Sequence, residues 1–283
     1  MSADQRSQYL QGKVIIVTGA GGGFGKLIAE KCAAGGAHVV GVDINADGVA
    51  ETAEGILAKG DSAIHQVADV TDMAQMKAAA ALAVERFGAI DVVVNNAGVM
   101  PLAYFADHER AWEKWHKAID INIKGVVNGI SAVYDQMIAQ GRGQVVNISS
   151  VYGNGGFEGS GVYSATKAAV TTLSDSLRIE AKGRIKVTTV KPTGVAGTNL
   201  ASWIVNDRAI MGIVGQRAGS YREHVTDLVK GTMPAELTDV DSVKYWLITP
   251  DDLANAVVHV IDQPWGISLS DVTVRASGED YLY

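Results

Sequence analysis

The sequence predicts an α/β fold: a doubly wound parallel sheet of about seven strands with helices on both faces. Short β-rich segments alternate with longer Ala-rich segments of helical periodicity, and Gly, Asn, Asp or Pro follows each β-rich segment. Hydrophobic residues make up 47% of the composition and aromatic residues only 6%, which is typical of the aliphatic core around a covered parallel sheet. A length of 283 residues suits one large α/β domain.

The β-rich segments follow one another in the order that βαβ units require. Between them, residues 50–59 and 73–87 carry Ala and Leu at helical spacing, with Glu, Lys and Arg at the remaining positions. This alternation implies right-handed crossovers and helices on both faces of the sheet. The predicted strands are residues 14–17, 39–42, 63–67, 92–94, 145–148 and 187–190, with a final edge strand at 272–274.

Residues 197–248 interrupt this alternation. They are rich in Met, Trp, Tyr and Gly and carry no strand signals, which predicts a substrate-binding insertion over the sheet. Thr249 and Pro250 then begin a last helix as its N-cap and first residue. We therefore expect residues 1–283 to form a single nucleotide-binding domain that carries this insertion.

The charge and the cysteine content exclude some classes of partner. The net charge is −7 and no Lys/Arg block is present, which argues against binding to nucleic acid or to anionic lipid. Residues 1–11 lack the apolar core of a signal peptide, and no segment approaches the roughly 20 apolar residues of a membrane span. The single cysteine, Cys32, is predicted to be a buried core residue. A cytoplasmic protein without membrane contact is expected.

A glycine-rich loop connects the first predicted strand to a helix that starts near Lys26. In this position glycines allow a tight turn, backbone access for a pyrophosphate and close packing of helix on strand, while the helix N-terminus faces the anion. A glycine-rich string by itself is weak evidence, but its place after the first strand predicts the cofactor loop of a Rossmann-like fold. The predicted cofactor-binding residues of this loop are Gly19, Gly22, Gly23, Phe24 and Gly25.

Asp43 ends the second predicted strand, 18 residues after Gly25. A carboxylate in this place accepts hydrogen bonds from both hydroxyls of the adenosine ribose and repels a 2′-phosphate. Neither residues 20–22 nor residues 44–45 supply a compensating base. The cofactor is therefore predicted to be NAD rather than NADP. The alternative is a solvated turn aspartate before Asn45.

From about Gly12 to Arg275, the chain resembles the shorter, single-domain branch of the short-chain dehydrogenase/reductase family. Residues 18–25 fit the branch pattern TGxxxGxG, although Gly22 also allows the TGxxGxxG of the longer epimerase branch. Other motifs decide for the shorter branch: NNAG at 95–98, an asparagine in the helix that follows, a serine 13 residues before a tyrosine, and YxxxK at 163–167. The resemblance implies the catalytic residues Asn122, Ser150, Tyr163 and Lys167.

The chemistry of these residues can also be argued without the family. Tyr163 and Lys167 are four residues apart on a predicted helix, so their side chains share one face. A free tyrosine ionises near pH ~10, and a nearby ammonium is expected to lower the pKa of Tyr163 toward that of a general base. Ser150 can donate to the substrate oxygen, whereas its neighbour Ser149 is assigned a structural role. The resemblance further implies that Lys167 binds the nicotinamide ribose and that Asn122 kinks its helix and holds a water of a proton path.

The resemblance implies further contacts with NAD. Asp69 and Val70 are expected to frame the adenine, and Asn96, Ala97 and Gly98 to line the adenosine side. Tyr163 and Lys167 contact the nicotinamide end. Pro192, Val195 and Thr198 belong to the segment that faces the nicotinamide amide, where the sequence departs from the family because Thr193 replaces a glycine and Thr198 comes one position late. No metal ligands are expected.

The predicted function is an NAD-dependent oxidoreductase that interconverts a secondary alcohol and a ketone, with an apolar or bulky aromatic substrate. A sugar-nucleotide epimerase or dehydratase, whose branch carries a larger substrate domain, and a catalytically silent NAD-binding regulator are the alternatives. The resemblance implies a homodimer or homotetramer formed through the helices of Asn122 and Tyr163. Candidate pocket residues, which could equally be core or interface, are Tyr152, Asn154, Phe157, Leu200, Trp203, Ile204, Ile210 and Met211.

Overall fold

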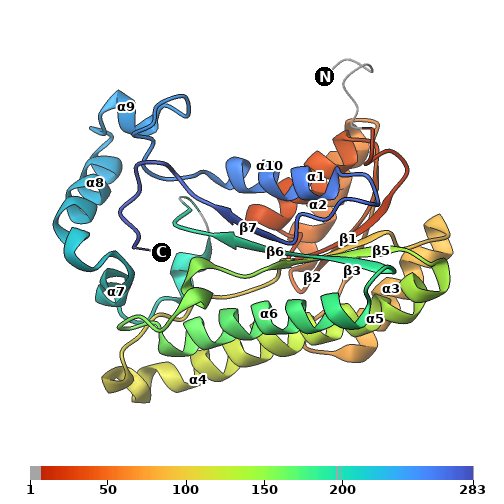
Figure 1. Ribbon diagram of the computed structural model, residues 1–283, viewed down its shortest axis with the longest axis horizontal. Coiled ribbons are helices and arrows are strands. Elements are labelled where there is room, and N and C mark those ends of the chain that lie inside the picture. The colour runs from red at the N-terminus through yellow and green to blue at the C-terminus, as the bar shows by residue number, and fades with distance from the viewer. Residues whose placement is uncertain (1–7, 196, 198, 283) are drawn as a thin grey trace.

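The computed structural model describes residues 8–195, 197 and 199–282, and its centre is one parallel sheet of seven strands. The strand order is β3-β2-β1-β4-β5-β6-β7, so the predicted doubly wound sheet is confirmed (Figure 1). Each predicted strand is found, and each extends beyond the predicted range by at least one residue. The strands are β1 (Val14–Thr18), β2 (His38–Asp43), β3 (Ser62–Val67), β4 (Val92–Asn95), β5 (Gly143–Ile148), β6 (Ile185–Pro192) and β7 (Asp271–Val274).

Helices cover both faces of the sheet, and each face has its own apolar core. Because side chains of a strand alternate between the faces, Ile15 and Val17 of β1 belong to one core, and Val14 and Ile16 to the other. One core includes residues of α1 (Gly23–Ala34), α2 (Ala46–Ala58) and α10 (Pro250–Ile261). The other includes residues of α3 (Met73–Phe87), α5 (Gly125–Gln140) and α6 (Gly161–Glu180). Figure 1 shows the two layers on opposite sides of the sheet.

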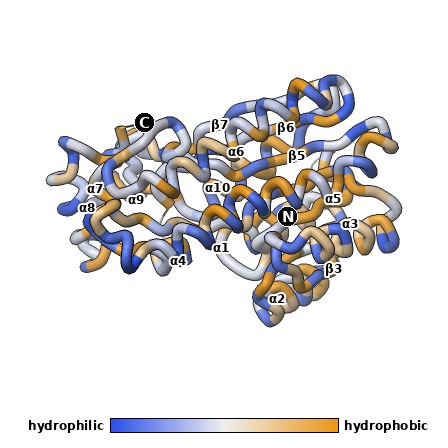
Figure 2. Tube along the Cα trace, turned by 90° about the horizontal axis from the view of Figure 1, so that it is seen from below, coloured by the Kyte–Doolittle hydropathy of each residue, from blue (hydrophilic) through white to orange (hydrophobic). Residues whose placement is uncertain are grey.

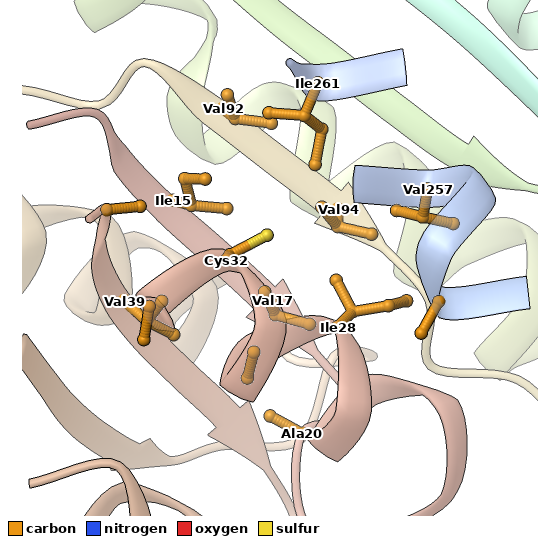
Figure 3. Packing of buried hydrophobic residues seen from close by; sticks show 14 of the residues in the cluster. Ile15, Val17, Ala20, Ile28, Cys32, Val39, Val92, Val94, Val257 and Ile261 are labelled. Atoms are coloured by element: carbon orange, nitrogen blue, oxygen red, sulfur yellow. The ribbon is translucent and has the colours of Figure 1, made fainter. Parts of the chain in front are cut away.

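Cys32 lies inside the first of these cores, as predicted. Its side chain is fully buried between α1, the sheet and α10, in the company of Ile15, Val94 and Val257 (Figure 3). Burial in this apolar environment raises the pKa of the Cys32 thiol to about 12. The thiol is therefore a small core group and unreactive at neutral pH.

Local capping signals set where the helices begin. Asn45 accepts the N–H of Gly48 at 3.2 Å, so α2 starts at Ala46, four residues before the predicted start. The last helix, α10, begins as predicted: Thr249 Oγ1 accepts the N–H of Asp252, and Asp252 Oδ2 accepts the N–H of Thr249. The helix predicted near Lys26 starts at Gly23, directly on the glycine loop.

The predicted insertion folds into short helical segments beyond the carboxyl ends of the strands. These include α7 (Met211–Val214), α8 (Ala218–Lys230) and α9 (Ala235–Thr238), which gather at one end of the molecule (Figure 2). A third buried cluster joins this region to the rest of the chain, and it includes Tyr152, Tyr163, Tyr221, Trp246 and Tyr281. The insertion is thus packed against residues at the carboxyl edge of the sheet.

The segment after β7 returns across this end of the molecule. Its Asp280 is buried and accepts three hydrogen bonds, from Trp246 Nε1 at 2.8 Å, from Ser220 Oγ at 2.8 Å and from His224 Nδ1 at 3.1 Å. Charge-assisted hydrogen bonds of this kind are the strong ones in proteins. They hold the C-terminal segment to α8 and so fix the place of the next residue, Tyr281.

Among the residues described, no helix has both the length and the apolar character needed to cross a bilayer.

Candidate active site

A cavity of about 640 Å³ opens at the carboxyl ends of the strands, between the sheet and the insertion. Open parallel sheets bind ligands at this edge, where the strand order reverses next to β1. Most of the predicted site residues line this one cavity, although they come from six separate stretches of the chain. They are Gly19, Gly22, Gly23, Phe24, Asp43, Asn96, Ala97, Gly98, Ser150, Tyr163, Lys167, Pro192 and Val195.

Five predicted residues are not placed on the cavity wall. Thr198 lies outside the described residues, so its contact with the nicotinamide stays a prediction. Gly25, Asp69, Val70 and Asn122 are not among the lining residues that the structure describes. The Asp69 carboxylate accepts the N–H of Thr71 within its own turn, and the Val70 carbonyl accepts from Asn128 of α5. These contacts anchor the loop that follows β3, and the adenine contact remains a prediction.

The glycine loop has the conformation that the sequence required of it. Gly19 and Gly23 have φ of 71° and 53°, a region in which a side chain is strained. A Cβ on Gly25 would lie 2.0 Å from the carbonyl oxygen of Gly19, so Gly25 is the residue that lets α1 pack onto the end of β1. Its role in this structure is close packing, which was one of the three uses predicted for the glycines.

The N-terminus of α1 is free to bind an anion. Gly22 at the N-cap makes no side-chain cap, and the first turn of α1 carries no acidic residue. The first residues of this 12-residue helix, together with the N-cap Gly22, form part of the cavity wall. Its uncapped N–H groups are therefore available to a ligand in the cavity. This arrangement fits the pyrophosphate of a dinucleotide cofactor.

Asp43 connects the glycine loop to the end of β2. Its Oδ2 accepts the N–H of Gly21 at 2.8 Å, and its Oδ1 accepts the N–H of Asn45 at 2.8 Å. The second contact is the turn interaction that the alternative interpretation assigned to Asp43, but the residue also lines the cavity. Each carboxylate oxygen retains a further lone pair for a ligand hydroxyl. The free acceptor positions of Asp43 therefore fit the hydroxyls of the adenosine ribose of the cofactor.

The NNAG segment holds the strands together at the point where the sheet order reverses. Asn96 Nδ2 donates to the carbonyl of Thr18 at 2.9 Å, and the N–H groups of Asn96 and Ala97 donate to Thr18 Oγ1 at 3.0 and 3.1 Å. Gly98 follows without a Cβ, and a Cβ there would lie 3.2 Å from Asn122 Oδ1 and 3.5 Å from Lys167 Nζ. The segment thus shapes the cavity wall beside the predicted catalytic residues Asn122 and Lys167.

Asn122 lies in a five-residue π-helical turn, Asp120–Lys124, between α4 (His108–Ile119) and α5. Such turns interrupt a helix locally and are frequent at functional sites. The Asn122 side chain is buried, accepts the N–H of Val99 at 2.9 Å, and donates to the Val99 carbonyl at 2.9 Å and to Thr166 Oγ1 at 3.0 Å. It therefore joins the loop after β4 to the helix of Tyr163.

Tyr163 and Lys167 lie on α6, and both side chains line the cavity. Lys167 Nζ is 5.9 Å from the centre of the Tyr163 ring and donates to the Ile148 carbonyl at the end of β5, at 2.9 Å. Ser150 Oγ accepts the N–H of Tyr152 at 3.2 Å and forms a hydrogen bond with Tyr163. Ser150, Tyr163 and Lys167 therefore meet at one end of the cavity.

Ser149, the rival of Ser150, is engaged elsewhere. Its hydroxyl donates to the Lys167 carbonyl at 2.8 Å and lies 3.2 Å from Thr171 Oγ1. It also borders the cavity, but its hydrogen bonds join β5 to α6. This geometry agrees with the structural role predicted for it.

Burial controls the ionisation of the two groups on α6. It raises the pKa of Tyr163 to about 12, against the smaller lowering by the hydrogen bond with Ser150. It also lowers the pKa of Lys167 to about 8. The expected lowering of the Tyr163 pKa by Lys167 is therefore not found in the chain by itself, because an apolar environment disfavours the phenolate and the ammonium alike. At neutral pH Tyr163 is a neutral phenol that can donate a proton.

The part of the cavity wall that adjoins Tyr163 is largely aromatic, and sequence reasoning found only part of it. Five of the proposed pocket residues line the cavity, namely Tyr152, Leu200, Trp203, Ile204 and Ile210; Asn154, Phe157 and Met211 do not. The residues that the sequence did not indicate come from the loop after β4, from α8, from the segment before α10 and from the C-terminal segment. They include Met100, Tyr221, Val225, Leu228, Trp246, Leu247 and Tyr281.

The family model for short chain dehydrogenases matches residues 13–209 of the chain. An uncharacterized oxidoreductase of Listeria monocytogenes is 33% identical over 272 residues, which are 96% of this chain and 99% of the relative. Glycine betaine reductase of Emericella nidulans is 30% identical over 271 residues, 95% of this chain but 19% of that much longer protein.

Solved structures agree with this relationship. Levodione reductase superimposes with a TM-score of 0.76 at 25% identity, over 94% of this chain and 97% of its own. An alcohol dehydrogenase from Thermococcus sibiricus, complexed with 5-hydroxy-NADP, shares the fold with a TM-score of 0.75 at 21% identity, over 96% and 99% of the two chains. The motifs that meet at the cavity, the matching family model and the full-length relatives lead to one conclusion: the chain is an oxidoreductase of the short-chain dehydrogenase family.

Proposed function

We propose that the protein interconverts a secondary alcohol and a ketone with NAD(H) as its cofactor. The observation that carries this proposal is the meeting of Ser150, Tyr163 and Lys167 at one end of a cavity whose other residues include the glycine loop and Asp43. A buried phenol, a hydroxyl and an ammonium at one place suit proton transfer to and from an alkoxide.

In the direction of ketone reduction, Ser150 and Tyr163 hold the substrate oxygen between their hydroxyls. The bound nicotinamide supplies the hydride. Tyr163 donates its proton to the oxygen as negative charge develops there, and the high pKa of the buried phenol keeps that proton available at neutral pH. Lys167 stabilises the resulting phenolate, and we assign the donors of its ammonium that Ile148 leaves free to the nicotinamide ribose. Asn122 binds Val99 and Thr166 and so holds the loop after β4 against the helix that carries Tyr163 and Lys167.

The remaining cofactor contacts are assigned to the residues that border the same cavity. The loop residues Gly19, Gly22, Gly23 and Phe24 face the pyrophosphate, and Asp43 accepts from the adenosine ribose. Pro192, the last residue of β6, and Val195 line the cavity and are assigned to the nicotinamide end. NAD is proposed although a metagenomic short-chain oxidoreductase with 26% identity and a TM-score of 0.71 was solved with NADP. The carboxylate of Asp43 is the reason, because it disfavours a second anion on the ribose.

Asp43→Asn is expected to lower the preference for NADH over NADPH, expressed as the ratio of kcat/KM values, by about tenfold or more. The amide keeps an acceptor for one of the two backbone N–H groups but loses the charge that repels the 2′-phosphate. Steady-state kinetics with both cofactors measure the ratio. Asp69→Asn, which changes a carboxylate that does not line the cavity, is the control and should leave the ratio unchanged. An unaltered ratio in Asp43→Asn would mean that Asp43 does not discriminate between the cofactors.

The substrate is proposed to be an apolar or aromatic ketone, because the cavity lining includes residues such as Leu200, Trp203, Ile204 and Trp246. We expect the purified protein to oxidise NADH in the presence of aryl-alkyl ketones and to reduce NAD⁺ with the matching secondary alcohols. The absorbance of NADH measures both directions. A panel of bulky and aromatic ketones that gives no consumption of NADH above the rate without substrate would contradict the proposal.

The protein is further proposed to be a single-domain cytoplasmic enzyme that assembles as a homodimer or homotetramer. One sheet with a core on each face, and an insertion packed onto its edge, supports the single domain. Assembly is supported by large apolar side chains that are exposed along α4 and the residues around it, among them Phe105, Trp112, Ile119 and Val127.

A further inference from the structure

The hydroxyl of Tyr152 is a buried polar group without a partner. Tyr152 is 6% exposed and lines the cavity, yet its hydroxyl has no hydrogen bond within the described part of the chain. Its ring packs edge-to-face on Tyr163, with centroids 5.3 Å apart, and on Phe157 at 5.6 Å. The residue follows Ser150 by two positions, and its own N–H donates to Ser150 Oγ. Tyr152 therefore belongs to the substrate end of the cavity and adjoins both groups that hold the substrate oxygen.

The other tyrosines at this end use their hydroxyls within the protein. Tyr281 and Tyr221 form a hydrogen bond with each other, and their ring centroids are 6.0 Å apart. Tyr281 also packs against Gly194, where a Cβ would lie 2.4 Å from Tyr281 Cε2. Both residues line the cavity. Among these three, Tyr152 is the residue whose hydroxyl is left for a ligand.

The hydroxyl of Tyr152 is energetically unfavourable in the chain alone. A buried donor and acceptor that makes no hydrogen bond has lost its water without compensation, and native proteins rarely contain such groups. Phenylalanine would fill the same space and make the same contacts with Tyr163 and Phe157 at no such cost. A tyrosine is explained here if a bound molecule supplies the partner.

The cavity lining also limits the kind of partner. The charged side chains among the described lining residues are Asp43, on the glycine loop, and Lys167, which the proposed function assigns to the phenolate and the nicotinamide ribose, so no other charged side chain balances a carboxylate or an ammonium of the substrate. The partner is therefore a neutral oxygen. Because the Tyr152 ring contacts Tyr163, that oxygen lies close to the reacting carbonyl rather than at the far end of the substrate.

We propose that the hydroxyl of Tyr152 forms a hydrogen bond with a second, neutral oxygen of the substrate, one or two carbons from the reacting carbonyl, and thereby selects hydroxyketones and diketones over simple ketones. This inference rests on the proposed function and names the substrate class of the same site. Tyr152 is a specificity-determining residue in this scheme, whereas the proton is transferred by Tyr163.

Two pairs of ketones test the proposal: phenylacetone with its benzylic-hydroxyl derivative, and benzylacetone with its benzylic-hydroxyl derivative. The members of each pair differ by one hydroxyl, which lies one carbon from the carbonyl carbon in the first pair and two carbons in the second. We expect the wild-type protein to prefer the hydroxylated member of at least one pair in kcat/KM. Tyr152→Phe should reduce that preference about tenfold, because kcat/KM should fall more for the hydroxylated member than for the parent ketone.

Stability provides the second measurement. Tyr152→Phe should melt at or above the wild-type temperature, because it removes a hydroxyl that has no partner in the protein. The matched control is Tyr245→Phe, outside the cavity, where the hydroxyl donates to Asp252 at 2.8 Å. This control should lower Tm and leave the substrate preference unchanged.

The outcomes separate the inference from the proposed function. An equal preference in wild type and Tyr152→Phe, an equal loss on both members of each pair, or a marked fall in Tm would each overturn the role of Tyr152. If the wild-type protein reduces none of the four ketones in a manner that depends on Tyr163, the proposed function itself fails and the inference fails with it.

Discussion

Tyr163→Phe is expected to lower kcat/KM for ketone reduction by about 10³-fold. The substitution removes the hydroxyl that donates the proton, and general acid catalysis by a positioned group is worth about 10²- to 10⁴-fold. The ring and its contact with Tyr152 remain, so the cavity should keep its shape. Binding of NADH, followed by its fluorescence, should be nearly unaffected, which would assign the loss to chemistry. A decrease of less than about tenfold with any substrate of the panel would mean that another group transfers the proton.

The same tyrosine gives the two reaction directions different pH dependences. Ketone reduction needs the neutral phenol, which a pKa of about 12 in the chain alone maintains throughout the neutral range. Alcohol oxidation needs the phenolate. As long as the pH is below the pKa, the fraction of phenolate increases about tenfold for each unit by which the pH rises. Oxidation by the wild-type protein should therefore accelerate as the pH rises, and Tyr163→Phe should lose this dependence. Tyr245→Phe, whose hydroxyl lies outside the cavity, should behave as wild type.

Lys167→Met is expected to abolish most of the activity and yet to stabilise the protein at pH 7. Burial lowers the pKa of Lys167 from 10.5 to about 8, and a shift of this size corresponds to a cost of roughly 3 kcal/mol for keeping the ammonium charged in the folded state. Loss of the hydrogen bond to Ile148 offsets about 1 kcal/mol of the gain. The free energy of unfolding should rise by about 2 kcal/mol, while kcat/KM should fall by about 10²-fold or more because the phenolate loses its neighbouring charge.

The sign of the pH dependence follows from the direction of the pKa shift. Below pH 8 the lysine is protonated in the folded and unfolded states, so the wild-type protein bears the full cost. Between pH 8 and 10.5 the unfolded state binds more protons, and the wild-type stability rises with pH. The stability difference between Lys167→Met and wild type should therefore be largest below pH 8 and shrink above it.

Denaturant unfolding at several pH values measures this difference. The exposed Lys182 provides the control, since Lys182→Met should change neither the activity nor the pH dependence of stability. If Lys167→Met were less stable than wild type at pH 7, the buried ammonium would have to be compensated by contacts other than the one with Ile148. Together, Tyr163→Phe and Lys167→Met test whether burial of the catalytic groups of α6 in an apolar environment lowers the stability of the protein.

The sequence by itself determined the fold and most of the candidate site. The alternation of β-rich and helical segments predicted all seven strands. Inner strands such as β1 and β4 are buried on both faces and read as aliphatic runs, whereas the edge strands β3 and β7 keep exposed residues and were found from their place in the alternation. The glycine loop was predictable because Gly19 and Gly23 adopt backbone conformations that other residues avoid, and Gly25 leaves no room for a side chain. The spacing of four residues put Tyr163 and Lys167 on one helix face, and the position of Ser150 after a predicted strand put it at the carboxyl edge of the sheet. That the three belong to one site was implied by the family resemblance.

Only the tertiary structure decided which residues complete the substrate end and how the site ionises. Tyr221, Trp246 and Tyr281 come from α8, from the segment before α10 and from the C-terminal segment, where no periodic pattern or motif fixes a position. Their place depends on long-range contacts such as the hydrogen bonds to the buried Asp280. The pKa values of Tyr163 and Lys167 moved opposite to the simple pairwise expectation because desolvation is a property of the whole packed environment. Local sequence specifies local geometry, whereas burial is set by everything that packs around a group.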